Sequence, residues 1–165
     1  MPTSWRQDVV GVAPRSAPLK DEWVSNVDLG GAASWLTGVR RLAVLTGAGI
    51  STDSGIPDFR GPSGVWTRDP AAEKMSTYRA YVADPAVRLR SWQARLTHPA
   101  WTAKPNAAHI AVARIASRIE TCVITQNIDG LHQRAGVPED EVLELHGTMH
   151  AVVCVGCGDR TGMRE

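Results

Sequence analysis

The sequence predicts an α/β fold, in which a parallel sheet is covered by helices on both faces. Two observations lead to this prediction: short apolar runs that end in polar or glycine-rich turns, and helical apolar stripes between those runs. Continuous apolar runs are typical of strands buried on both sides, as in parallel sheets. A length of 165 residues suffices for one domain of ordinary size.

Composition and charge narrow the class of protein. Apolar residues make up 43% and charged residues 21%, as in folded globular chains, and no apolar run is long enough for a membrane span. A formal charge of +1 provides no basic field, so we expect neither a nucleic-acid nor a membrane partner. Three cysteines cannot all pair, and nothing near Met1 resembles a signal peptide, so we expect a cytoplasmic protein.

The first elements follow from prolines and apolar spacing. Residues 1–27 hold three prolines among scattered charges and are predicted to be an extended leader. Asp28 is expected to cap a helix over residues 29–36, and Gly38 is expected to end it. Residues 41–46 are predicted to be a buried strand that runs directly into a glycine turn.

The middle of the chain is predicted to be helical. Residues 67–104 are expected to form a covering segment with one helix over about 73–82 and another over 85–96. The second helix has a favourable start, since Asp84-Pro85 is a good N-cap and N1 pair.

A further helix and two strands follow. Asn106 opens a helix with one apolar stripe, and residues 121–125 form the second buried strand. A short helix over 131–135 ends at Gly136, and residues 142–145 are the third candidate strand. The order of strands and helices is that of a parallel α/β sheet.

The glycine turn after the first strand is a candidate phosphate site. In Gly47-Ala48-Gly49-Ile50, glycine lets phosphate oxygens approach the backbone, and parallel α/β sheets present N–H groups to a pyrophosphate at such turns. The dehydrogenase fingerprint fails here, because its third glycine would fall at Thr52. By itself the turn is equally consistent with an ordinary tight turn.

The stretch from Ser51 to Trp66 is a candidate ligand loop. It holds glycines, prolines, two carboxylates and two aromatic side chains, including the run Asp58-Phe59-Arg60. This mixture is too irregular for a core and too elaborate for a linker, which indicates a loop folded over a ligand.

Polar clusters follow the second and third strands. Gln126 and Asn127 can hydrogen-bond an amide or a ribose, and Asp129 can orient them. His146 follows the third strand and is a residue type that exchanges protons near neutral pH. Each residue alone has a structural interpretation as a turn former or a structural histidine. Together, clusters that follow three parallel strands would meet at one edge of the sheet.

The cysteines suggest a metal knuckle. Cys154-Val-Gly-Cys157 has the spacing of a zinc ligand pair, and flanking glycines fit a redox pair less well. A structural zinc site takes four ligands, so these two cysteines and His150 would still be one short. Cys122 lies in the second strand and is predicted to be a small buried side chain.

At these residues the sequence resembles the sirtuins, the family of NAD-dependent protein lysine deacylases. The matching strings stand in the family's order over about residues 40–157. They are Thr46-Gly-Ala-Gly-Ile-Ser51, Gly55-Ile-Pro-Asp-Phe-Arg-Gly-Pro-Ser-Gly-Val-Trp66, Pro105-Asn-Ala-Ala-His109, Thr125-Gln-Asn-Ile-Asp-Gly-Leu-His132, Glu144-Leu-His-Gly147 and Cys154-x-x-Cys157.

The resemblance implies a Rossmann-like NAD-binding domain, of which residues 28–150 would be the N-terminal part, and a zinc module begun by residues 151–165. It implies His146 as general base and Asn127 as a second catalytic residue. The implied NAD-binding residues are Gly47, Ala48, Gly49, Ile50, Asp58, Phe59, Arg60, Trp66, Gln126, Asn127, Ile128 and Asp129, and the implied zinc ligands are Cys154 and Cys157.

The implied reaction transfers an acyl group from a lysine of an acetylated protein or peptide to ADP-ribose, with release of nicotinamide. The family's desuccinylating branch has a tyrosine where this chain has Trp92, so deacetylation is expected. The second cysteine pair and about three strands of the family are absent, so we expect a C-terminally truncated sirtuin. Two alternatives stay open: a non-catalytic remnant that binds NAD weakly, and protein ADP-ribosyl transfer.

Overall fold

The computed structural model describes residues 29–164, and the chain divides into two compact units, Met1–Gly38 and Val39–Glu165. In the first unit, helix α1 spans Leu29–Leu36, as predicted, and Gly38 follows it with φ +88°. Only glycine adopts this conformation without strain, which explains the end of the helix. The predicted cap Asp28 and the predicted leader lie outside the described residues.

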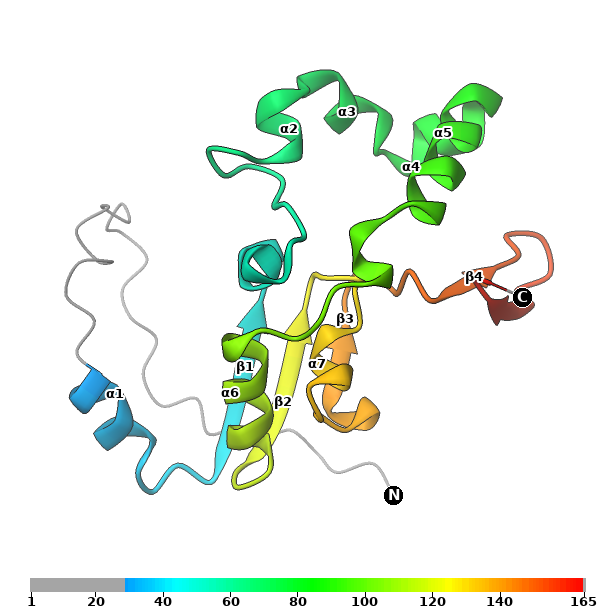
Figure 1. Cartoon of the computed structure of the whole chain (residues 1–165). Coiled ribbons are helices and arrows are strands. Elements are labelled where there is room, and N and C mark those ends of the chain that lie inside the picture. The colour runs from blue at the N-terminus through cyan, green and yellow to red at the C-terminus, as the bar shows by residue number, and fades with distance from the viewer. Residues whose placement is uncertain (1–28, 165) are drawn as a thin grey trace. The chain divides into compact units, whose positions relative to one another are not determined.

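A three-stranded parallel sheet is the centre of the second unit (Figure 1). Strands β1 (Arg41–Thr46), β2 (Glu120–Thr125) and β3 (Val142–Glu144) lie in the order β1-β2-β3. Thr46 is level with Thr125, and Thr125 is level with Glu144. The three strands therefore end at one edge, as the sequence predicts, and the residues that follow them are brought close together.

Two helices cover one face of this sheet: α6 (Ala107–Ala116) and α7 (Leu131–Arg134) (Figure 1). The start of α6 at Asn106 is confirmed, because the Asn106 side chain accepts hydrogen bonds from the first-turn amides. The short helix α7 ends just before Gly136, whose φ of +108° confirms the predicted stop.

The two faces of the sheet differ in burial. On the covered face, Thr121, Val123 and Thr125 are buried, and Val123 is fully so. On the opposite face, Leu45 is 68% exposed and Leu143 is 53% exposed. The expected helices are thus observed over one face of the described sheet.

The prediction that Cys122 is buried is wrong, because its side chain is half-buried. Successive side chains of a strand point to opposite faces. Cys122 alternates with Thr121 and Val123 and therefore lies on the face with Leu45.

The covering segment is helical, as predicted. Its elements are α2 (Val65–Arg68), α3 (Pro70–Met75), α4 (Tyr78–Ala83), α5 (Pro85–Leu96) and the 3₁₀ helix η3 (Pro99–Trp101). In Figure 1 the helices α2 to α5 lie beyond the carboxyl ends of the strands.

The prediction of a single helix over residues 73–82 is wrong, since two short helices, α3 and α4, occupy this region. The break lies at Thr77, whose backbone is extended and whose side chain accepts a hydrogen bond from the Ala80 amide at 3.2 Å. Thr77 therefore caps a new helix, as threonine often does. The helix over 85–96 is confirmed, and its cap Asp84 accepts from the Ala86 amide at 2.8 Å.

A small hydrophobic core joins segments that are distant in sequence. Buried side chains from four segments pack together: the loop after the 3₁₀ helix η2 (Ala48–Ser54), the end of the covering segment, α7, and the loop before strand β4 (Ala151–Val153). They are Ile56, Ala100, Ala103, Leu131 and Met149, with Trp101 and Ile128 packed against them. This core holds the loops that follow β2 and β3 in place beside the carboxyl edge of the sheet.

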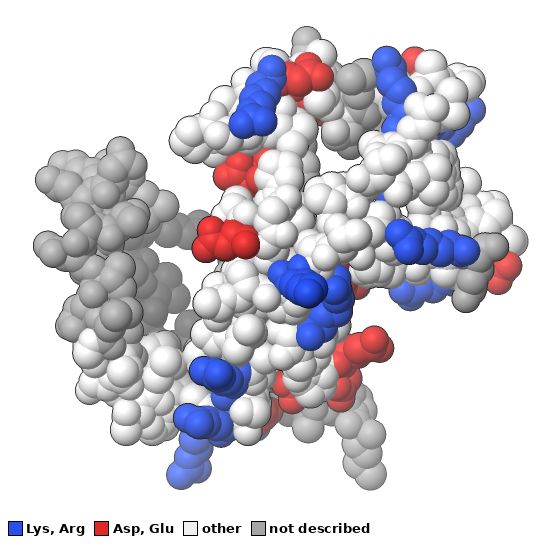
Figure 2. All heavy atoms as spheres, in the orientation of Figure 1, with Lys and Arg blue, Asp and Glu red and all other residues white. Residues whose placement is uncertain are grey.

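The last elements form an antiparallel hairpin of β4 (Ala151–Val153) and β5 (Arg160–Gly162), and the two cysteines of the predicted knuckle lie in the turn between them. Among residues 29–164, no helix combines the length and apolar character that crossing a bilayer requires. On the face shown in Figure 2, basic and acidic side chains are interspersed.

Candidate functional site

The glycine turn after β1 is held by a side chain from the loop after β2. Gly47 precedes the 3₁₀ helix η2 (Ala48–Ser54), and its carbonyl accepts a hydrogen bond from Asn127 Nδ2 at 3.1 Å. The same amide nitrogen donates to Ser51 Oγ at 3.2 Å. Both amide hydrogens of Asn127 are therefore used to hold the turn, and only its Oδ1 is left as an acceptor.

Asp129 completes this connection. Its Oδ2 accepts from Ser51 Oγ at 2.7 Å, and its Oδ1 accepts from the Leu131 amide at 2.9 Å. Ser51, Asn127 and Asp129 are all buried. We call these three side chains the polar network. Because buried hydrogen bonds are costly to leave unmade, the network fixes the two loops relative to each other.

A second set of bonds lies on the covered face. Thr46 Oγ1 donates to Thr125 Oγ1 at 2.9 Å, and His132 Nε2 lies 2.9 Å from Thr46 Oγ1. Since the Thr46 hydrogen is donated to Thr125, His132 Nε2 donates to Thr46. Thr125 Oγ1 also accepts from the Asn127 amide at 3.1 Å, which links this set to the polar network.

Burial disfavours the charged form of three histidines near Asp129. The pKa values of His98, His109 and His132 are lowered, chiefly because burial penalises the charged imidazolium, although the Asp129 carboxylate opposes this effect in each case. The rings of His109 and His132 lie 5.0 Å apart, and their mutual repulsion lowers the pKa of His132 further.

His146 is exposed at the carboxyl edge, just beyond β3. Its Nδ1 lies 3.0 Å from the carbonyl oxygen of Gln126. A carbonyl can only accept, so Nδ1 carries the proton, and Nε2 of the neutral ring is a free base. This is the arrangement of a proton acceptor held in one tautomer by the backbone.

The C-terminal part of the candidate ligand loop, residues 58–66, is held mainly by contacts among its own residues. The Val65 amide donates to the Asp58 carbonyl at 2.8 Å, and the rings of Phe59 and Trp66 lie 4.7 Å apart. The Arg60 guanidinium carbon lies 4.5 Å from the centre of the Trp66 ring, and Arg60 Nη2 pairs with Glu73 at 3.1 Å. Among the described residues, no hydrogen bond joins residues 58–66 to the polar network.

The two cysteines of the predicted knuckle lie in a tight turn. The amides of Cys157 and Gly156 and the thiol of Cys157 donate to Cys154 Sγ and lower the pKa of Cys154. The Gly158 amide closes the turn onto the Cys154 carbonyl at 2.8 Å. No group of three or more metal-ligating side chains is found in residues 29–164, and His150 does not join the pair in one.

The structure brings together most, but not all, of the residues singled out in the sequence. Those that meet at the carboxyl edge are Gly47, Ala48, Gly49, Ile50, Gln126, Asn127, Asp129 and His146, with Ile128 packed against the core. The loop residues Asp58, Phe59, Arg60 and Trp66 form their own cluster. Cys154 and Cys157 lie in the separate hairpin.

Sequence reasoning missed several functional positions. Ser51 connects Asn127 to Asp129, and Asn106 Nδ2 donates to the Ile50 carbonyl at 2.7 Å. The threonine pair carried a signal, since Thr46 and Thr125 each close an apolar strand. The burial of His109 and His132, by contrast, left no signal in the strand and helix periodicity of the sequence.

The fold and the site define an α/β protein with a preformed turn and an oriented histidine at one edge of a parallel sheet. This is where open α/β sheets bind nucleotides. The Sir2 family model matches residues 47–165, so the chain belongs to the Sir2 (sirtuin) family.

Individual relatives agree with this assignment. The chain is 56% identical over 131 residues to NAD-dependent protein deacetylase 2 of Streptomyces coelicolor, which covers 79% of this chain and 54% of the relative. It is 48% identical over 127 residues to NAD-dependent protein deacetylase 1 of Mycobacterium avium, covering 74% and 42%.

A solved structure of a Sir2 protein with a deacetylated p53 peptide and 3′-O-acetyl ADP-ribose superposes with a TM-score of 0.69 at 37% identity. It covers 82% of this chain and 53% of that one. The chain thus spans about half the length of these relatives. The expected Rossmann-like fold is confirmed.

Proposed function

We propose that this chain contributes to NAD-dependent protein lysine deacetylation, the transfer of an acetyl group from lysine to ADP-ribose with release of nicotinamide. The observation that carries the proposal is the His146 tautomer: Nδ1 is bound to the Gln126 carbonyl, which leaves Nε2 of the exposed ring as the acceptor at the carboxyl edge of the sheet. Both curated relatives described above are named NAD-dependent protein deacetylases.

The turn has room for the NAD phosphates. A Cβ built on Gly47 or on Gly49 would meet no atom within 4 Å, so packing does not require glycine at either position. Open space above a backbone held by Asn127 is what the close approach of a phosphate needs. We assign Gly47, Ala48, Gly49 and Ile50 to this contact.

His146 acts as the base. NAD supplies the ADP-ribosyl group that accepts the acetyl group. His146 Nε2 takes the proton from a ribose hydroxyl, while the Gln126 carbonyl holds Nδ1–H and stabilises the ring as it becomes charged. Asn127 supports this step indirectly, since its amide hydrogens hold the glycine turn.

The loop over residues 58–66 is assigned to the nicotinamide side of NAD. Asp58 Oδ1 accepts from the Gly61 amide at 3.1 Å, which keeps the loop compact. Phe59 is 47% exposed and presents an apolar ring that can exclude water from a bound ligand.

Cys154 and Cys157 are assigned as two ligands of a structural zinc ion. The turn directs three hydrogen bonds to Cys154 Sγ and lowers its pKa, which favours the thiolate that binds zinc. Acetylated proteins or peptides are the proposed substrates. A cytoplasmic location remains a prediction from the sequence.

The experiment that tests this function follows the products. The chain is incubated with zinc, an acetyl-lysine peptide and NAD labelled in the adenosine half, and nicotinamide, free-lysine peptide and O-acetyl-ADP-ribose are measured. Equal amounts of the three support deacetylation. Label that stays on the peptide or on the chain indicates ADP-ribosyl transfer, and binding of NAD without any product indicates a non-catalytic chain.

A further inference from the structure

We propose that His150 is a positioning residue for the site, which holds the Asp129 carbonyl and thereby ties the cysteine hairpin to the polar network. The proposal deepens the proposed function, since it concerns the same site. His150 lies directly before β4, and Asp129 lies in the loop after β2.

The contact is a directed hydrogen bond. His150 Nε2 lies 3.1 Å from the Asp129 carbonyl oxygen. Because a carbonyl accepts only, Nε2 carries the proton and donates it. The ring lies close to the neighbouring Gly130, where a Cβ would be 2.9 Å from Nε2 and 3.1 Å from Cδ2. The left-handed φ of Gly130, +68°, together with this approach requires glycine there.

With this bond, three oxygen atoms of Asp129 accept hydrogen bonds. Its side-chain oxygens accept from Ser51 Oγ and from the Leu131 amide, and its carbonyl accepts from His150. The donors of the first two bonds lie in η2 and at the start of α7, whereas the third donor, His150, lies directly before β4. His150 therefore connects the start of the hairpin to a member of the polar network.

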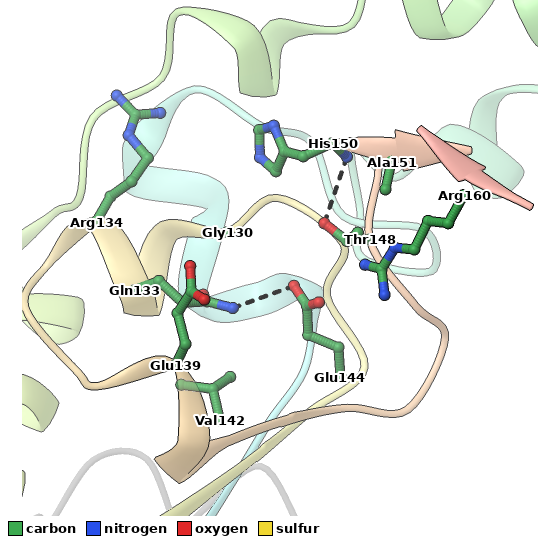
Figure 3. A pocket seen from close by; sticks show the side chains of 10 residues that line it. All are labelled: Gly130, Gln133, Arg134, Glu139, Val142, Glu144, Thr148, His150, Ala151 and Arg160. Carbon is green, nitrogen blue, oxygen red and sulfur yellow. Dashed lines mark hydrogen bonds between the residues drawn. The ribbon is translucent and has the colours of Figure 1, made fainter. Parts of the chain in front are cut away.

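The imidazole also contacts an aromatic ring. Its ring meets the Trp101 ring edge-on, with centres 5.2 Å apart, and the Trp101 indole donates to the Arg95 carbonyl at 2.6 Å. The His150 amide donates to Thr148 Oγ1 at 3.3 Å (Figure 3). The exposed imidazole thus contacts both the Asp129 carbonyl and the Trp101 ring.

Met149, the residue before His150, makes a second hydrogen bond to the loop after β2. The Met149 amide donates to the Ile128 carbonyl at 3.0 Å, so consecutive residues bond consecutive carbonyls of the loop after β2. On the hairpin side, the Met163 amide donates to the His150 carbonyl at 2.9 Å. Figure 3 shows His150 and Gly130 among the residues that line a cavity of about 470 Å³, in which the hairpin faces α7.

Two substitutions separate the hydrogen bond from ring packing. His150→Gln retains an N–H donor of similar reach and loses the ring, whereas His150→Phe retains the ring against Trp101 and loses the donor. Val155→Ala is the control within the same hairpin, since Val155 is 82% exposed.

The first measurement needs no ligand. Amide hydrogen exchange is followed at Leu131, which donates to Asp129 Oδ1, with the amides of β2 as a reference for global opening. We expect exchange at Leu131 to quicken about fivefold in His150→Phe, as for the loss of one hydrogen bond of about 1 kcal/mol, and to stay near wild type in His150→Gln. The second measurement is NAD affinity, expected to weaken about fivefold in His150→Phe and to be rescued in His150→Gln.

The order of the Leu131 exchange rates among the variants decides whether His150 positions Asp129. A Leu131 amide that exchanges at the wild-type rate in His150→Phe, or equally fast in both variants, overturns the positioning role. Wild-type chain that binds no NAD counts against the proposed function, and the exchange order still tests His150 by itself. Val155→Ala is expected to match wild type in both measurements.

Discussion

The polar network and the loop over residues 58–66 are held in different ways. The network consists of buried side chains, and its bonds join residues about 80 positions apart, such as Gly47 and Asn127. The loop is exposed, and its contacts are local, such as the ring pair of Phe59 and Trp66. Long-range buried bonds fix the network before a ligand arrives, whereas the loop is shaped as a unit without being fastened to the network.

The largest expected effect comes from removing the centre of the network. Asp129→Ala leaves Ser51 Oγ and the Leu131 amide without their buried acceptor, and we expect the free energy of unfolding to fall by about 3 kcal/mol in urea titrations. Asp58→Ala in the loop loses one bond, to the Gly61 amide, and is expected to cost about 1 kcal/mol or less. Equal costs would contradict the comparison.

A lower pH is expected to destabilise the region around the polar network but not the loop over residues 58–66, because this loop contains no histidine. Burial lowers the folded pKa of His98, His109 and His132 below the unfolded value of 6.5, so the unfolded chain binds more protons as the pH falls. Stability is therefore complete above pH 6.5 and declines below it, toward the lowered pKa values. Urea midpoints between pH 8 and pH 5 measure this decline, and greater stability at pH 5 would contradict it.

Two glycines distinguish a packing constraint from a ligand constraint. A Cβ on Gly64 would lie 2.6 Å from the Phe59 carbonyl carbon and oxygen, so Gly64→Ala is expected to destabilise by about 1–2 kcal/mol through a backbone shift. Gly47 has an extended backbone and open space, so Gly47→Ala is expected to change stability by less than about 0.5 kcal/mol.

The functional effect of Gly47→Ala is expected to exceed its effect on stability. NAD affinity, measured by calorimetry, should weaken about tenfold or more, because the added methyl group occupies the space assigned to the phosphates. Unchanged NAD binding in Gly47→Ala would contradict the assignment of the glycine turn to the NAD phosphates.

The smallest effect concerns the ion pair that joins the loop to α3. The side chains of Arg60 and Glu73 are 75% and 53% exposed, so Glu73→Gln is expected to cost less than about 0.5 kcal/mol and to cost still less at high salt. Urea titrations at two salt concentrations check this. A cost above about 1 kcal/mol would mean that the loop is fastened nearly as firmly as the network.

Periodicity and turn chemistry predicted the frame of the site well. The strand over residues 41–46, the start of α6 at Asn106 and the helix over 85–96 all follow from local patterns of apolar, capping and proline residues. The convergence of the three strand ends also followed, because parallel strands must end at one edge.

The failures are long-range in origin. Ser51 acts through Asp129, 78 residues away, and no local pattern records such a partner. Thr77 starts a new helix because its side chain satisfies the Ala80 amide, which competes with helix continuation. Cys122 is half-buried because the face it shares with Leu45 is exposed among the described residues.

The central claim is that His146 Nε2 is the base of a deacetylation reaction. The direct test compares turnover of an acetyl-lysine peptide by the His146→Ala variant with turnover by an Arg118→Ala control. Arg118 is exposed and precedes β2, at the opposite edge of the sheet from His146. Loss of a positioned general base predicts a fall of about 100-fold or more in His146→Ala, with NAD affinity within about twofold of wild type. Turnover in His146→Ala equal to that in Arg118→Ala would contradict the account.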